Sequence, residues 1–231
     1  MVSLKRNKNG EFVKATGLRS RASSIYKPNQ KEDYKISRGR FANYLACPKC
    51  FYFDRVKGLT EPSMPGWTLN TLTDTLLKKE FDECRAQQKP HRILVENKLS
   101  HIIPFQHEEM DNWRNSLSGG LQVRFKDTNI ILQGGVDDIW LNTKTDEIII
   151  ADYKSQHSNY GVSQETYFKS FYHDGYKTQL DFYAYLLIGM GFKVSKDAYL
   201  YICNAIERDE GFHGKMHFEE VLIHYEVKTD Y

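Results

Sequence analysis

The sequence predicts an α/β domain in which a central mixed β-sheet is flanked by helices. Segments with apolar residues at helical spacing alternate with segments rich in β-branched and aromatic residues, which are typical of strands. The run "IIIA" at 148–151 has no polar alternation, which indicates a strand covered on both faces. The 231 residues suffice for one domain with a sizeable core. The order of helix, three strands, helix and strand favours a mixed sheet.

The N-terminal end differs in composition from the rest of the chain. Residues 1 to 40 hold eleven Lys/Arg and three Asp/Glu, a balance of +8, against −6 for the remainder. This end lacks apolar periodicity and is rich in Lys, Arg, Ser and Asn, as mobile or loosely docked segments are. We therefore expect a flexible basic arm at 1–35 and the folded domain at 36–231. The arm is either a nonspecific phosphate tether or a solubilising tail.

No segment has the apolar pattern of a secretory signal, and no apolar run is long enough to cross a bilayer. Glu11 and the missing amphipathic pattern argue against a mitochondrial transit peptide. The sequence thus favours a cytoplasmic protein with no membrane partner.

Helices are expected in four segments. Ser37 is a candidate N-cap for a short helix that Pro48 interrupts. From Leu69 to about Ala86, leucines and Phe81 recur at helical spacing, which predicts a long helix with one buried stripe. Two more are expected in "FQHEEMDNWRNSL" and, with the strongest pattern, in "YKTQLDFYAYLLIGMG".

Three consecutive segments, "LQVRFKD", "NIILQGGVDDIWLN" and "EIIIADYK", have strand composition and are separated by short turn sequences. They predict a three-strand meander, and "DAYLYICNA" and "HFEEVLIHYEV" predict two later strands. Gly134 and Gly135 are unusual inside a strand and indicate a bend or a close approach by another segment.

Charged side chains gather where these predicted strands end. Asp152 and Lys154 point to the same side, because successive side chains on a strand alternate. Asp137 lies near the end of the neighbouring predicted strand, and carboxylates from adjacent strands suit Mg²⁺ or Mn²⁺. A cation there would activate water, and Lys154 would stabilise the charge that develops at a phosphate. This pattern favours phosphodiester hydrolysis. Gln179 and Tyr183, four residues apart on a predicted helix, share one face that could reach the same end of the sheet.

The motifs G-x-x-D (134–137), D-x-K (152–154) and Q-x-x-x-Y (179–183) resemble, in this order, those of the PD-(D/E)XK nuclease superfamily. The resemblance is to its RecB-like branch, which also contains the CRISPR-associated RecB-like exonucleases. The segment "ISRGRFANYLACPKCFYFDRV" is similar to the helix, Cys-Pro and aromatic pair that open many RecB-like domains. The likeness spans roughly residues 36–225.

The resemblance implies a restriction-endonuclease-like core, dependence on Mg²⁺ or Mn²⁺, and DNA as substrate. It implies that Asp137, Asp152 and the backbone carbonyl of Tyr153 bind metal. The implied catalytic residues are Asp137, Asp152, Lys154, Gln179 and Tyr183. Many RecB-like nucleases add a histidine from the first long helix, but that helix has no histidine here. Asp74 is the position we align with it, with Glu80 as a second choice on another side of the helix.

Several of these residues also have a simpler structural interpretation. Asp152 and Lys154 could form only a surface ion pair, and Asp138 is expected to be a solvated or supporting neighbour of Asp137 that faces the other way. Tyr183 could be a core residue, and Asp74 could be exposed or a local cap.

Cys47 and Cys50 have the spacing of half a zinc or iron–sulfur site, but no second C-x-x-C follows. Cys84 and Cys203 are isolated in a helix and a strand, where cysteine is usually a small core residue. We expect no iron–sulfur cluster.

The stretch "HSNYGVSQETYFKSFYHDGYK" mixes aromatic and basic residues, which can stack on bases and pair with the backbone of a single strand. The candidate nucleic-acid contacts are Tyr160, Lys169, Tyr172 and Lys177. A buried cover over the sheet is the alternative.

Together these features predict a metal-dependent deoxyribonuclease, an exonuclease by analogy, that acts on single-stranded or end-frayed DNA in DNA processing or repair. Three alternatives remain open: a noncatalytic nucleic-acid-binding module, an RNA-directed nuclease, and a subunit that needs a helicase or another DNA-processing partner. The sequence has no ATP-binding P-loop of its own.

Overall fold

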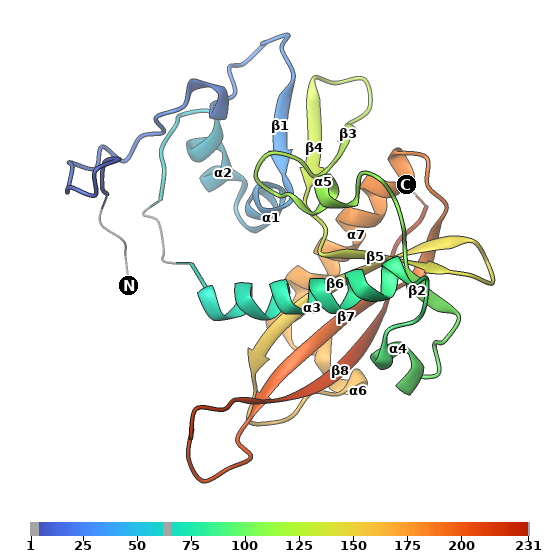
Figure 1. The fold of residues 1–231 in the computed structure, drawn as a ribbon. Coiled ribbons are helices and arrows are strands. Elements are labelled where there is room, and N and C mark those ends of the chain that lie inside the picture. Colours follow the sequence, from blue (N-terminus) through green and yellow to red (C-terminus); the bar gives the residue numbers. More distant parts are fainter. Residues whose placement is uncertain (1–4, 62–65, 231) are drawn as a thin grey trace. The chain divides into compact units, whose positions relative to one another are not determined.

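The computed structural model describes residues 5–61 and 66–230, and Figure 1 shows their fold. The chain divides into two compact units. The first is Met1–Trp67 with Arg124–Leu132, and the second is Thr68–Val123 with Gln133–Tyr231. The predicted arm at 1–35 and the predicted domain at 36–231 each include residues outside the described part of the chain.

The first unit contains η1 (Ala22–Ser24), β1 (Tyr34–Ser37), α1 (Arg38–Ala46) and α2 (Pro48–Arg55). Ser37 has the extended backbone of an N-cap, as predicted, but its side chain makes no capping hydrogen bond. Pro48 ends the first helix and begins the second at its first turn, where a missing N–H costs nothing. Asp54 forms ion pairs with Arg19, Arg40 and Arg55, so it ties the basic N-terminal segment to both helices.

The second unit holds most of the regular structure. Its helices are α3 (Thr68–Ala86), α4 (Arg92–Glu96), α5 (Met110–Arg114), α6 (Gln164–Tyr167), η2 (Phe171–His173) and α7 (Asp174–Gly189). Its five-stranded sheet has the order β2-β5-β6-β7-β8, formed by β2 (Ile102–Pro104), β5 (Asp138–Asn142), β6 (Glu147–His157), β7 (Val194–Ile206) and β8 (His217–Glu226). Only β6 and β7 pair in parallel, and α7 connects them. The predicted α/β class with a mixed sheet is confirmed.

Strand β6 runs through the middle of this sheet, and its two faces contact different helices. On one face, Ile149, Ala151 and Tyr153 join a core with Leu77 and Phe81 of α3. On the other face lie Ile150 and Asp152, and the buried side of α7 contacts this strand. Figure 1 shows α3 and α7 on opposite faces of the sheet. The alternation of side chains thus directs Asp152 and Lys154 toward α7.

The prediction of a three-strand meander is wrong in its middle strand. The stretch 129–142 forms two strands, β4 (Ile130–Gly134) and β5, and a bend separates them. β4 lies in a separate sheet of order β1-β4-β3, with β3 at Leu121–Arg124. Gly135 lies at the bend, where an added Cβ would come within 2.8 Å of the backbone of Ser116. The glycines mark a close approach, as predicted, and this approach ends the strand.

The buried stripe of α3 also differs from the prediction. Leu69, Leu72 and Leu76 are exposed, whereas Leu77 and Phe81 are buried. Asn70 donates a hydrogen bond to the carbonyl of Ser155 in β6, so the side of α3 that faces the sheet is polar in its first turns. The helix predicted over 105–117 is also shorter. α5 begins only at Met110, and the side chain of Asn115 accepts two backbone N–H groups in the turn that ends it.

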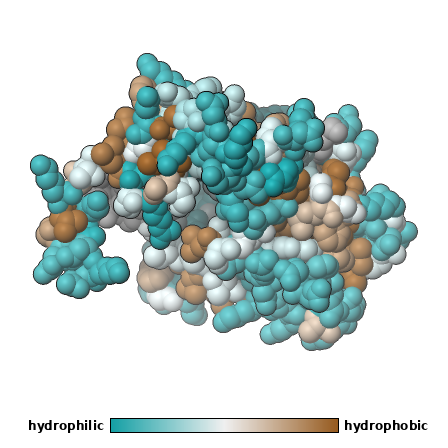
Figure 2. All heavy atoms as spheres, turned by 90° about the horizontal axis from the view of Figure 1, so that it is seen from above, coloured by the Kyte–Doolittle hydropathy of each residue, from teal (hydrophilic) through white to brown (hydrophobic). Residues whose placement is uncertain are grey.

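No helix in the described part of the chain is long and apolar enough to cross a membrane. Figure 2 shows a face on which hydrophilic residues predominate and apolar ones form small groups.

Candidate active site

Asp152 and Lys154 lie in the C-terminal half of β6, where this strand pairs with β7. Asp152 is fully buried. Its Oδ1 accepts a 2.6 Å hydrogen bond from Nε2 of Gln179, and its Oδ2 is in contact with the Lys154 ammonium. The pair is therefore not a surface ion pair, because one partner has no exposed surface and a third side chain fixes it.

Asp137 lies in the bend between β4 and β5, and two hydrogen bonds fix its position. Its Oδ2 accepts the backbone N–H of Tyr153 at 3.0 Å, which connects the bend to β6. Its backbone carbonyl accepts Nε of Arg114 at 3.1 Å. Tyr183 supports the same bend, because its hydroxyl donates to the carbonyl of Gly135 at 2.6 Å. Gln179 and Tyr183 thus contact the site from one face of α7, as the spacing predicts.

The first half of α3 brings Asp74 to the same place. Its Oδ2 accepts a 2.8 Å hydrogen bond from Lys78, and Nζ of Lys78 is 3.7 Å from Oδ1 of Asp137. The other oxygen of Asp74, Oδ1, is buried and has no hydrogen-bond partner. Glu80 points elsewhere and bonds to His91 at 2.9 Å. Of the two aligned candidates, only Asp74 lies beside Asp137.

Burial and repulsion both act on these carboxyl groups. Burial and, after it, the charge of nearby Asp137 raise the pKa of Asp152 to about 7, although Lys154 acts in the opposite direction. Burial likewise raises the pKa of Asp74, and Lys78 opposes this shift. Burial alone would lower the pKa of Lys154, but Asp152 and Asp137 raise it, so the ammonium form is favoured. Three carboxyl groups and two ammonium groups therefore lie in a partly buried environment, so the acidic groups outnumber the basic ones by one.

Tyr153 contributes its backbone and its side chain to opposite sides of the sheet. Its carbonyl oxygen is 3.5 Å from Nζ of Lys154, on the side of the acidic cluster. Its hydroxyl donates to Oδ2 of Asp138 at 2.7 Å in the core. Asp138 faces away from Asp137, as expected, but the prediction that it could be solvated is wrong. It is fully buried and bonded to Arg85 and Arg114, which lie on α3 and α5.

Two residues near Lys154 and Asp137 belong to none of the three sequence motifs described above. One is Lys78. The other is Tyr176, whose ring lies 5.0 Å from Nζ of Lys154 and therefore contributes a cation–π contact. Tyr176 is stacked in turn with His173 and Tyr167. The i, i+4 spacing of Asp74 and Lys78 is a signal in the sequence that could identify Lys78. The contact of Tyr176 with Lys154 is visible only in the folded structure.

Carboxylate oxygens are the ligands that Mg²⁺ and Mn²⁺ prefer. In residues 5–61 and 66–230, no three His, Cys, Asp or Glu side chains already have the arrangement of a metal site. The chemistry of the donor set nevertheless fits such an ion, since Asp137 lies near both Asp74 and Asp152 and Oδ1 of Asp74 is buried without a hydrogen-bond partner. Asp74, Asp137, Asp152 and the carbonyl of Tyr153 are the groups that could hold it.

The aromatic stretch after β6 is divided between core and surface. Tyr167 is buried and donates a hydrogen bond to Gln156. Tyr160 and Tyr172 are 99% and 77% exposed, which leaves both rings free to contact a ligand. Lys177 bonds to Asp174 at 2.9 Å and lies above the ring of Phe168. The stretch therefore covers the core at Tyr167 and is exposed at Tyr160 and Tyr172.

The four cysteines are divided between the two units. The Sγ of Cys47 accepts the backbone N–H of Cys50 at 3.2 Å at the start of α2. Cys84 and Cys203 are buried in the other unit, and burial raises the pKa of Cys203 to about 12. Both are core thiols.

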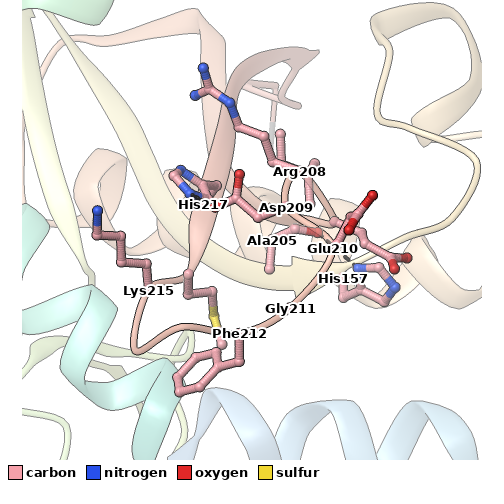
Figure 3. Close-up of a pocket in the computed structure, with 12 residues that line it drawn as sticks. His157, Ala205, Arg208, Asp209, Glu210, Gly211, Phe212, Lys215 and His217 are labelled. Carbon is pink, nitrogen blue, oxygen red and sulfur yellow. Dashed lines mark hydrogen bonds and ion pairs between the residues drawn. The ribbon is translucent and has the colours of Figure 1, made fainter.

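A separate pocket of about 380 Å³ lies at the loop between β7 and β8 (Figure 3). His217 in this pocket bonds to Asp209, and Phe212 is exposed at the loop. None of the predicted site residues lines it.

Comparisons with known proteins identify the family. No curated protein matches the chain. One solved structure, "Crystal structure of SSO0001", is 11% identical over 87% of this chain and 72% of the other, with a TM-score of 0.34. The family model of the PD-(D/E)XK nuclease superfamily matches residues 35–228. The mixed sheet with its flanking helices is consistent with the restriction-endonuclease-like core of that family. The chain therefore belongs to the PD-(D/E)XK nuclease superfamily, whose members are generally hydrolytic nucleases that use divalent metals.

Proposed function

We propose that this chain is a deoxyribonuclease of the RecB-like branch that hydrolyses phosphodiester bonds with Mg²⁺ or Mn²⁺. The observation that carries the proposal is the convergence of Asp74, Asp137 and Asp152 beside the buried Lys154–Asp152 pair. Three acidic groups near a partly buried lysine lower the stability of the folded protein, because burial penalises each charge, so stability alone does not explain them. Such groups are typical of a catalytic centre.

Each residue has a role that its contacts support. Asp74, Asp137, Asp152 and the carbonyl of Tyr153 would hold the cation, which when bound activates water and neutralises charge on the phosphate. Gln179 orients the Asp152 carboxylate through its 2.6 Å hydrogen bond. Tyr183 fixes the bend that carries Asp137.

Lys154 supplies the positive charge that stabilises the phosphate as the bond breaks. The side chain of Lys154 is 18% exposed, whereas that of Asp152 is not exposed at all, so the lysine is the member of the pair that can reach a substrate. Tyr176 limits where the ammonium can lie, since its ring covers one side of it.

The proposed substrate is single-stranded or end-frayed DNA, degraded from an end during DNA processing or repair. The exposed rings of Tyr160 and Tyr172 support base stacking, and Lys169 and Lys177 offer positive charge in the same stretch. The basic arm at 1–35 would add a salt-dependent contact with phosphates. A helicase or another DNA-processing protein is the kind of partner that would supply such ends.

The test is cleavage of end-labelled single- and double-stranded DNA, with matched RNA strands, in Mn²⁺, Mg²⁺ or EDTA. The Lys154→Ala and Asp152→Asn variants should lose cleavage while they remain folded. Lys144→Ala is a matched control, because Lys144 is an exposed lysine in the turn before β6. Full activity in either site variant would refute the mechanism. DNA binding without cleavage in any metal would favour a noncatalytic binding module or a partner-dependent subunit instead.

A further inference from the structure

Lys78 lies between two of the acidic groups of the candidate site. Its Nζ donates a 2.8 Å hydrogen bond to Oδ2 of Asp74 and is 3.7 Å from Oδ1 of Asp137. Lys78 and Asp74 are one turn apart on α3, so both side chains extend from the same side of the helix. No motif of the sequence includes this lysine.

Both carboxylates need a positive partner. The side chain of Asp74 is 30% exposed and that of Asp137 is 26% exposed, so water screens their mutual repulsion only in part. Lys154 is engaged with Asp152, and the hydrogen bond on Oδ2 of Asp137 comes from a neutral backbone N–H. Among the described residues, Lys78 is thus the cationic group that lies between Asp74 and Asp137.

We propose that Lys78 is an intrinsic counterion that holds Asp74 and Asp137 together before a divalent cation binds, and that the cation must displace it. This inference rests on the metal-dependent function proposed above. An ammonium group and a divalent cation repel each other and use the same carboxylate oxygens, so they cannot share Oδ2 of Asp74 and Oδ1 of Asp137 at close range. Lys78 has a flexible four-carbon stem and a side chain that is 22% exposed, which allows its ammonium group to move away from the carboxylates.

Lys78 keeps the two carboxylates near each other when no metal is present, so it preserves the site at the cost of weaker metal affinity. The buried Oδ1 of Asp74 remains without a partner in this arrangement, which leaves one oxygen that a cation can bind first.

The experiment measures Mn²⁺ binding to the full chain by calorimetry, without DNA, in the native protein and in Lys78→Met, Lys78→Arg and Lys79→Met. Lys78→Met should bind Mn²⁺ about tenfold more tightly, since it removes a positive charge that competes for the carboxylates of Asp74 and Asp137. Lys78→Arg keeps the charge and should gain no affinity. Lys79 is the exposed neighbour on α3, so Lys79→Met should match the native protein.

Melting without metal gives a second measurement. Lys78→Met should melt at a lower temperature than Lys79→Met without metal, and Mn²⁺ should raise its melting temperature by more. If Lys78→Met does not fold, Lys78→Gln replaces it. One pair of results would overturn this inference and leave the proposed function intact. The native protein would bind Mn²⁺ and Asp137→Ala would not, while the neutral Lys78 variants would bind Mn²⁺ no more tightly than the native protein. Absence of Mn²⁺ binding in every variant would overturn both.

Discussion

The side-chain amide of Gln179 donates a 2.6 Å hydrogen bond to Oδ1 of Asp152, and both side chains are buried. The amide comes from α7 and the carboxylate from β6, so this bond connects the helix to the strand that carries Lys154. Because Oδ2 of Asp152 contacts Lys154, the two oxygens of one buried carboxylate are held by two different side chains. The orientation of Asp152 therefore depends on Gln179.

We expect Gln179→Ala to weaken metal binding and cleavage by about 10- to 100-fold, as the loss of a group that orients a metal ligand typically does. The variant should also lose about 1–3 kcal/mol of stability, because a buried carboxylate oxygen loses its donor. Mn²⁺ titration, kcat and urea unfolding measure these effects. The exposed Gln87, just after α3, gives the control Gln87→Ala. Native metal affinity in Gln179→Ala would contradict the role of the amide.

Tyr176 should position Lys154 through its ring and not through its hydroxyl. The ring centroid lies 5.0 Å from Nζ, and partly desolvated contacts of this kind contribute up to about 2 kcal/mol. We expect Tyr176→Phe to retain most of the cleavage rate and Tyr176→Leu to lower kcat about tenfold, with KM nearly unchanged. Replacement by a fluorinated phenylalanine series separates the ring charge from packing, since kcat should fall with each added fluorine. A rate that does not change along the series would exclude the cation–π contribution.

The sequence predicts those parts of the site that depend on local periodicity. β6 is recognisable because its apolar run is long, and the period of two then places Asp152 and Lys154 on one face. The period of the α-helix likewise places Gln179 and Tyr183 together on α7. Both elements are where the pattern predicts them, since few other structures can bury such runs.

Other features depend on segments that are far apart in the chain, and these the sequence does not predict. The burial of Asp138 requires Arg85 and Arg114, which lie on α3 and α5. The bend that separates β4 from β5 depends on the close approach of Ser116 to Gly135. The pattern of one segment contains no information about its partners. The two glycines therefore indicate a bend or a close approach without identifying Ser116, and the pattern predicts one continuous strand where the structure has two.

The bend can be tested with a pair of glycine substitutions. An added Cβ at Gly135 would lie 2.7–2.8 Å from Ser116, including its backbone, so Gly135→Ala should cost about 1–3 kcal/mol and disturb nearby Asp137. Gly175 is in the first turn of α7, where an added Cβ meets nothing within 4 Å. Gly175→Ala should therefore be neutral or stabilise the protein by up to about 1 kcal/mol. Urea unfolding midpoints compare the two, and equal stability would refute the close approach.

Glu220 should make the stability of the sheet edge depend on pH. Its carboxylate accepts two 2.6 Å hydrogen bonds from Arg92 of α4, and one from the hydroxyl of Tyr201 at 2.7 Å. The hydrogen bonds from Arg92 hold the pKa of Glu220 below its ordinary value of 4.5. A carboxyl group with a lowered pKa contributes stability above its ordinary pKa and loses it as the pH falls through the folded-state pKa.

We expect Glu220→Gln to cost about 1 kcal/mol at pH 7, a modest amount because solvent screens the half-exposed Arg92. The difference from the native protein should shrink as the pH falls below 4.5, where the native carboxyl also becomes neutral. Glu219→Gln, at the exposed neighbouring position on β8, should change stability little at any pH. Urea unfolding of the three proteins between pH 3 and pH 7 measures this. A cost of Glu220→Gln that stays constant over this range would show that the Arg92 contact acts through packing and not through charge.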